Sequence, residues 1–209
     1  MKIELQKTVK KNILAIFFLV FTLINCNGQS QKIKEQHHEK GNTFSKPEGF
    51  YVLDSVDLDL KRKKIKIIVL ESDLKKTIEN VQHNSNSIFI LEYNGKGYKM
   101  ISENKTIVLK YDENCPADGF GGIVEKNNYF TVQQIFCSDF LFVNSYTTFK
   151  IDENADSVIL HKYGEEYTDR SNPDKKIPAK IWTKKDFGEV KFENVTEDFL
   201  LKIRSKKPL

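Results

Sequence analysis

The sequence predicts a mainly β protein with one or two short helices. Its apolar runs are short and rich in β-branched and aromatic residues, turn residues separate them at close spacing, and helical periodicity is scarce. Many short strands at such spacing are typical of antiparallel hairpins or a meander. We therefore expect one β domain over residues 49–209, preceded by a signal peptide and a tether.

The first 25 residues have the layout of a secretory signal. A lysine-containing stretch precedes an apolar run from Ile13 to Ile24, and Asn25-Cys26 follows. The run has 12 residues, whereas a helix needs about 20 to cross a bilayer, so we expect it to be removed. Leu23-Ile24-Asn25-Cys26 resembles the bacterial lipobox, which implies that Cys26 carries the lipid. A plain signal peptide with an incidental cysteine is the alternative.

Residues 26–48 are polar, with almost no apolar residue before Phe44. Such a segment cannot build a core, so we expect a flexible tether between the membrane and the domain. His37-His38 lies in it, where a solvated pair is expected rather than a metal site. No acidic cluster directly follows Cys26, and in some lipoproteins such a cluster directs surface export. We therefore expect an outer-membrane location that faces the periplasm.

The charge balance argues against nucleic acid as a partner. The chain has 33 Lys and Arg against 29 Asp and Glu, and removal of residues 1–25 takes away four Lys and one Glu, which leaves 29 against 28. Nucleic-acid binding depends on clustered cations that neutralise phosphates, which a near-neutral chain does not favour. No motif indicates a cofactor.

Of the three cysteines, Cys115 and Cys137 remain once Cys26 is assigned to the lipid. Exported proteins meet an oxidising compartment, so we expect these two to form a disulfide. A buried pair of free thiols is the alternative. Metal binding is less favoured because neither cysteine has a second Cys or His at ligand spacing.

The elements follow from alternation and turn residues. Predicted strands are Gly49–Leu53, Ile65–Leu70, Ser87–Tyr93, Tyr98–Ile101, Thr106–Tyr111, Gly122–Glu125, Tyr129–Phe136, Phe140–Ile151, Ser157–Tyr163 and Val190–Phe192. Turns are expected at Asn94-Gly95-Lys96-Gly97, Glu103-Asn104-Lys105, Lys126-Asn127-Asn128 and Asp152-Glu153-Asn154. Short helices are predicted over Ser72–Val81 and over Thr196–Ser205, the latter with Thr196 as cap.

Asp57 and Asp59 lie ahead of a basic run and an apolar strand. This segment resembles the acidic repeat of FG-GAP and VCBS-type proteins, in which an Asp-rich loop binds calcium. The third ligand position is Lys61 here, and cations at ligand positions repel calcium, so no metal is expected. We expect Lys61–Lys64 to replace the ion by pairing with Asp54, Asp57 and Asp59. A solvated basic turn is the alternative.

Further segments add to this likeness: a glycine-rich stretch over residues 112–122, Asn128–Gln134, Thr147–Lys150 and Lys185–Phe192. Together they resemble Gram-negative envelope lipoproteins of unknown function that join one calcium-loop-like segment to a β domain. The resemblance names no reaction. Some proteins with this style of β module act as periplasmic inhibitors or immunity proteins, but fold alone does not fix function.

Known catalytic motifs are missing from the sequence. Glu165 and Glu166, beside Tyr163 and Tyr167, form the one acidic-aromatic cluster that suggests a carboxylate pair. We expect a non-enzymatic module that binds an envelope protein or glycan, an inhibitor among the options. A wall or polysaccharide hydrolase is the alternative, and a calcium-dependent module is a third hypothesis.

Aromatic residues are abundant, with 15 Phe and 8 Tyr, and most are expected in the core. Alternation in the segment Phe140–Tyr146 would place some of them on the opposite face, where aromatic side chains often mark binding surfaces.

Overall fold

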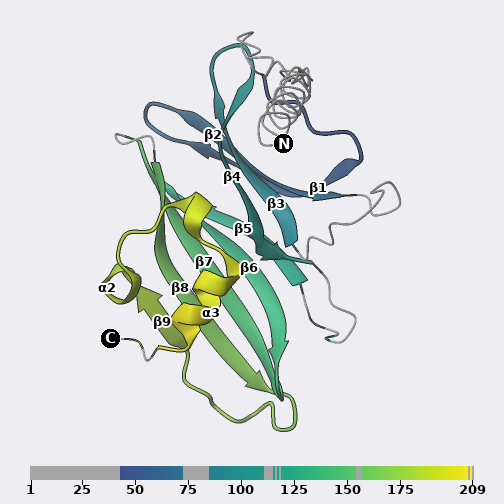
Figure 1. Cartoon of the computed structure of the whole chain (residues 1–209), viewed down its shortest axis with the longest axis vertical. Helices are drawn as coiled ribbons and strands as arrows, with labels where there is room; N and C mark the ends of the chain where they lie inside the picture. Colours follow the sequence, from purple (N-terminus) through teal and green to yellow (C-terminus); the bar gives the residue numbers. More distant parts are fainter. Residues whose placement is uncertain are drawn as a thin grey trace, which may run out of the picture. The chain divides into compact units, whose positions relative to one another are not determined.

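The computed structural model describes residues 43–72, 85–110, 115, 117, 119–153, 157–206 and 208. Within these residues the strands form two antiparallel meanders, in which each strand pairs with the next one along the chain (Figure 1). The four-stranded sheet, sheet A, contains β1 (Phe50–Asp59), β2 (Lys64–Ser72), β3 (Ser85–Tyr93) and β4 (Tyr98–Leu109). The five-stranded sheet, sheet B, contains β5 (Gly119–Lys126), β6 (Tyr129–Ser138), β7 (Leu141–Asp152), β8 (Ser157–Asp169) and β9 (Lys180–Thr183). The predicted mainly β, antiparallel fold is confirmed.

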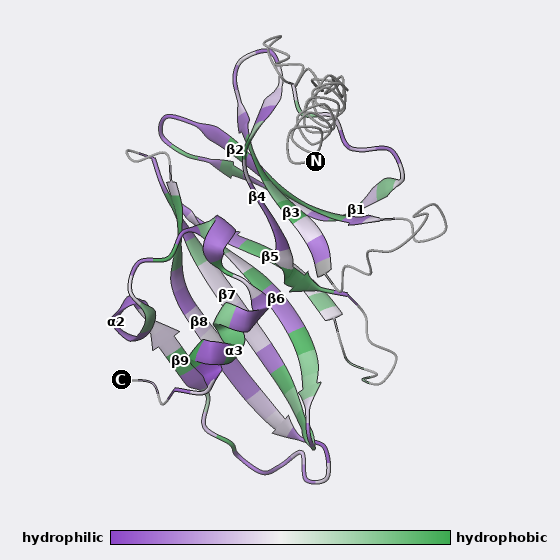
Figure 2. Cartoon of the chain, in the orientation of Figure 1, coloured by the Kyte–Doolittle hydropathy of each residue, from purple (hydrophilic) through white to green (hydrophobic). Residues whose placement is uncertain are grey.

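One hydrophobic core joins the two sheets. Alternate residues of the central strands point into it, and the strands in Figure 2 accordingly alternate between hydrophobic and hydrophilic colours. Sheet A contributes mainly isoleucine and valine, whereas sheet B contributes aromatic rings. Fully buried contributors include Ile67, Ile90, Phe130, Phe149, Trp182 and Phe192. Because both sheets supply this core, neither can bury its inner face alone.

Three buried or half-buried polar side chains tie the sheets and the C-terminal segment together. The Nδ2 of Asn104 in β4 donates to Phe192 O (2.7 Å) and Val195 O (2.8 Å), while its Oδ1 accepts from the amides of Thr106 and Ile107. Figure 1 shows the C-terminal segment, in yellow, running across the strands of sheet B. A side chain that satisfies four backbone groups replaces a stretch of strand pairing.

The other two ties lie between β4 and β6 and between β1 and β5. Gln134 accepts from Leu109 N (2.6 Å) and donates to Ile107 O (2.9 Å), so it pairs with the backbone at the edge of sheet A. The carboxylate of Asp54 accepts from Ile123 N at 2.8 Å. Nearby, β5 carries a bulge between Phe120 and Gly122.

The helices are short. Helix α3 (Glu197–Arg204) begins after Thr196, whose hydroxyl accepts from Phe199 N, and buries Leu200 and Ile203 against sheet B; this confirms the predicted C-terminal helix. Helix α2 (Lys184–Phe187) was not predicted, although Thr183 and Asp186 form its capping box. None of the helices in the described residues is long and apolar enough to span a membrane.

Some predicted elements differ in the structure. Val190–Phe192 is not a strand: Lys191 makes a single bridge to Ile159, and Phe192–Asn194 forms the 3₁₀ turn η1. Strand β9 was missed. The expected turn at Glu103-Asn104-Lys105 lies within β4, where the pairing with β3 shifts register between Asn104 and Val108. The predicted helix over Ser72–Val81 falls outside the described residues apart from Ser72, which ends β2.

Sheet A also carries a smaller cluster on the face opposite the core, made by Leu70, Phe89 and Leu91. Phe44 packs against it, with its ring 5.4 Å from that of Phe89, and its amide donates to the carbonyl of Tyr98. Phe44 belongs to the segment assigned to the tether, so contacts with the β domain begin before residue 49.

The acidic segment of β1 forms a ladder with its neighbour strand. Asp57 and Asp59 lie within the strand, not in a loop, and face Lys66 and Lys64 across the β1–β2 pair. Their carboxylates lie 2.7 Å and 3.9 Å from these two ammonium groups. Of the expected pairs, the described ion pairs include Lys64 with Asp59, whereas strand pairing aligns Asp57 with Lys66 and Asp54 accepts from Ile123 N.

Candidate functional site

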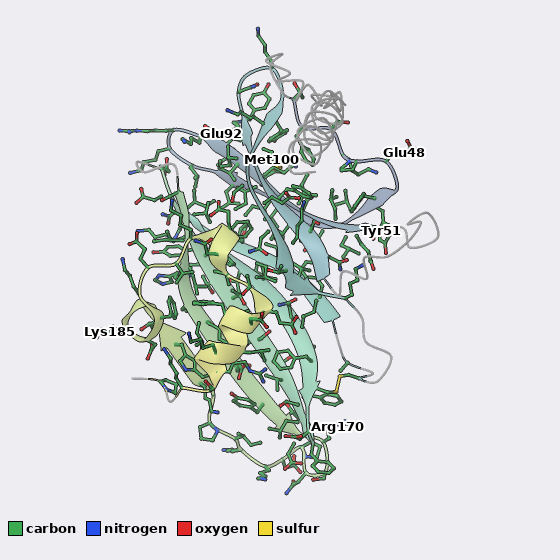
Figure 3. The ribbon with its side chains drawn as sticks, in the orientation of Figure 1. Glu48, Tyr51, Glu92, Met100, Arg170 and Lys185 are labelled. Carbon is green, nitrogen blue, oxygen red and sulfur yellow. A yellow bond between two sulfur atoms is a disulfide. The ribbon has the colours of Figure 1, made fainter. Side chains whose placement is uncertain are left out.

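One end of sheet B brings together three sets of residues that the sequence singled out: Cys137, the Phe140–Tyr146 aromatic segment, and the Glu165–Glu166 cluster. Two connections form this end, the β6–β7 turn and the β8–β9 loop. We call residues 138–142 together with 169–179 the tip. Arg170, labelled in Figure 3, marks its place at the end of sheet B.

The β6–β7 turn presents an aromatic side chain to solvent. Ser138 pairs with Leu141, and between them Asp139 adopts a φ of 54°, which Asp tolerates better than most residues. Phe140 completes the turn with 77% of its surface exposed. Its neighbour Phe142 lies on the outer face of sheet B, half-buried. The aromatic segment is thus divided between the turn and the outer face.

Contacts on several sides fix the turn. Arg170 N donates to Phe140 O at 2.9 Å, and the Arg170 guanidinium lies 5.1 Å from the ring of Phe142. Cys137, opposite Phe142 in the register, forms a disulfide with Cys115, and their Cα atoms are 5.7 Å apart. Strand pairing, a cation–π contact and a covalent bond therefore all hold the frame that carries Phe140.

Asp169 orders the start of the β8–β9 loop. Its Oδ1 accepts from Ser171 N (3.0 Å) and Ser171 Oγ (2.7 Å), and its Oδ2 lies 3.0 Å from Lys175 Nζ. The hydrogen bonds from Ser171, with those from Lys175, hold the pKa of Asp169 well below its usual range. The charged carboxylate is therefore part of the loop's structure.

Glu165 is the centre of a buried polar cluster on the inner face of sheet B. Its side chain is 2% exposed, its Oε1 accepts from the Tyr163 hydroxyl (2.6 Å), and its Oε2 accepts from the Tyr167 hydroxyl (2.5 Å). Burial, followed by the contacts with Glu165, raises the pKa of both tyrosines. Arg204 Nε of α3 lies 2.5 Å from Oε1, an ion pair outside hydrogen-bond geometry.

Glu166 faces the other way. Adjacent residues of a strand point to opposite faces of the sheet, and Glu166 accepts from the Tyr146 hydroxyl (3.1 Å) on the outer face. Since Glu165 and Glu166 do not converge, they cannot flank one substrate bond as the two carboxylates of a glycosidase must. The geometry gives the predicted carboxylate pair no catalytic arrangement, and Glu165 serves to fix α3 and β8.

The remaining candidates are dispersed or lie elsewhere. Cys26, His37, His38 and His83 fall outside the described residues. His161 lies against Tyr129 in a tilted contact, with ring centres 4.8 Å apart; partial burial, then Lys162 and Lys150, lower its pKa. Within the part of the chain that the structure describes, no three acidic, cysteine or histidine side chains gather as metal ligands.

Sequence reasoning missed two features of this site: the anchoring of Glu165 by Arg204 and the ordering of the loop by Asp169. The second had a local signal, because Asp followed two residues later by Ser is typical of an Asx turn. The contact between Glu165 and Arg204 had no local signal, because 39 positions separate the two residues in the sequence. Comparisons with family models, curated proteins and solved structures gave no significant match, so the site is interpreted from its own geometry.

Proposed function

We propose that this chain is a lipid-anchored envelope protein that binds a protein partner through its tip, without catalysing a reaction. The observation that carries the proposal is Phe140, 77% exposed on a turn that strand pairing, Arg170 and the disulfide hold in place. Burying a phenylalanine side chain contributes about 2–3 kcal/mol. An aromatic ring on a fixed frame loses little conformational freedom on binding.

The surroundings of Phe140 favour a protein as the partner. The tip carries three acids and three bases: Asp139, Asp169 and Asp174, and Arg170, Lys175 and Lys176. An aromatic centre within a mixed polar rim is the usual composition of a protein–protein interface. The three acids disfavour an anionic lipid surface. A partner with an apolar pocket, entered by the hairpin as an inhibitor enters an enzyme, fits this arrangement.

The anchor is the second half of the proposal. Lipid on Cys26 would hold the domain at the outer membrane, facing the periplasm, on the segment 26–42. Mass spectrometry of protein purified from membranes tests this directly. We expect a mature N-terminus at Cys26 that carries acyl chains, and an unmodified Cys26 or a retained leader would contradict it.

Site-specific photo-crosslinking in intact cells tests the binding surface. A benzophenone amino acid is placed at position 140 and, as a matched control, at Ile181, which is 54% exposed on the edge strand β9. We expect one protein, identified by mass spectrometry, to be crosslinked from position 140 and not from 181. Adducts of equal pattern from both positions, or adducts with lipid alone, would contradict the proposal.

A further inference from the structure

The guanidinium of Arg204, in the last turn of α3, is held in one orientation from two sides. Its Nε lies 2.5 Å from Glu165 Oε1, and its Cζ lies 4.6 Å from the centre of the Phe136 ring. The Arg204 side chain is 23% exposed, so it is partly open to solvent, although its Nε is buried. Glu165 is itself fixed by two tyrosine hydroxyls, which makes it a positioning residue for this arginine.

The two Nη amino groups of Arg204 are available to donate hydrogen bonds to a ligand. Among the described residues no hydrogen bond is formed by either Nη, and the contacts of Arg204 are the ion pair of its Nε with Glu165 and the cation–π contact with Phe136. A guanidinium presents its amino groups as a planar fork that matches a carboxylate or phosphate group. An oriented fork with solvent access needs little rearrangement to bind such a group.

A second cation lies on the same face of sheet B. Lys180 of β9 stands opposite Glu165 in the register, and its Nζ is 5.4 Å from the ring centre of Tyr167. No carboxylate within the described ranges pairs with Lys180. Arg204 and Lys180 together carry two positive charges against the one negative charge of Glu165, whose oxygens are already occupied.

We propose that Arg204 and Lys180 form a binding site for a small anionic group, a carboxylate or a phosphate, beside the rings of Phe136 and Tyr167. The fork of Arg204 would hold two oxygens of the anion, and Lys180 would supply the remaining charge. The rings offer apolar surface to the rest of the ligand. This site lies on the inner face of sheet B and does not depend on the partner proposed for Phe140.

The three arginines of the chain, Arg62, Arg170 and Arg204, give three side-chain Nε–Hε signals by NMR. The purified protein is titrated with inorganic phosphate and, separately, with acetate, at ionic strength held constant with chloride so that screening does not change. We expect the Arg204 signal to shift along a saturable curve in the millimolar range. Saturation by phosphate alone or by acetate alone identifies the class of anion.

Arg170 is the matched control, because it also lies over a phenylalanine ring but, unlike Arg204, forms no ion pair with a carboxylate among the described residues. We expect Lys180→Gln, a change at an exposed position, to weaken anion binding at least about fivefold through loss of one charge-assisted contact, and Arg170→Lys to leave it unchanged. The proposal is overturned if the Arg204 signal shifts no more than that of Arg170 with both anions, or if Lys180→Gln leaves its saturation curve unchanged.

Discussion

Glu165→Gln separates a structural role of this buried carboxylate from any catalytic one. The change removes the negative charge 2.5 Å from Arg204 Nε and leaves a single amide oxygen where two carboxylate oxygens accept from Tyr163 and Tyr167. Removing one partner of a fully buried ion pair costs about 3–5 kcal/mol. Because Arg204 is partly exposed and water can solvate it, we expect about 2–4 kcal/mol of lost unfolding free energy.

Urea unfolding measures this loss. Trp182, the single tryptophan, is fully buried and stacks on Tyr163 with ring centres 5.6 Å apart, so its fluorescence reports on the cluster. With a urea slope of about 2 kcal/mol per molar, the midpoint should fall by about 1–2 M.

Glu166→Gln is the control for this measurement. Glu166 is the next residue of β8 but faces solvent, and its hydrogen bond within the described part of the chain comes from Tyr146, so we expect a loss below about 1 kcal/mol. Losses for the two variants that agree within about 0.5 kcal/mol would refute the assignment of Glu165 to the buried cluster.

Three further predictions concern the frame of the domain. Asn104→Ala should cost about 3–5 kcal/mol in urea unfolding, because it leaves four backbone groups without their partner, three of them in buried contacts; a loss below 1 kcal/mol would contradict this. Replacing both Cys115 and Cys137 by alanine should cost about 3 kcal/mol by calorimetry, from reopening a loop with a sequence separation of 22, and an unchanged melting temperature would argue against the bond. Because the pKa of Asp169 is lowered in the folded protein, this carboxylate stabilises the fold at pH values above its unfolded pKa of about 3.9, and the stabilisation is lost as pH falls below that value. The free energy of unfolding of Asp169→Asn should therefore fall less steeply below pH 4 than that of the unmodified protein. Parallel curves for the two proteins would exclude the role of Lys175 and Ser171.

The hairpins were predictable because local signals and strand pairing agree. Alternation along Tyr129–Phe136 and Ser157–Tyr163, with asparagine-rich turns between strands, reappears as paired strands of sheet B. The C-terminal helix was predictable for the same reason, since Thr196 caps it. In each case the residues that determine the element are neighbours in sequence.

The errors arose where a distant partner overrides the local pattern. Glu103-Asn104-Lys105 has the composition of a turn, yet Asn104 is buried within β4 because the carbonyls of Phe192 and Val195 are its partners. Asp57 resembled a calcium ligand because its spacing to Asp59 is local, whereas its contact with Lys66 depends on the β1–β2 register. The exposure of Phe140 could not be predicted from the sequence either, because it depends on which residues form the turn between β6 and β7.

The central claim, that the tip binds a protein partner through Phe140, is tested most directly by the affinity of the identified partner for purified variants. We expect Phe140→Ser to weaken binding at least about tenfold, equivalent to about 1.4 kcal/mol, and Ile181→Ser to leave the affinity unchanged. Equal affinities for the Phe140→Ser variant and the unmodified protein, measured by calorimetric titration, would contradict the account.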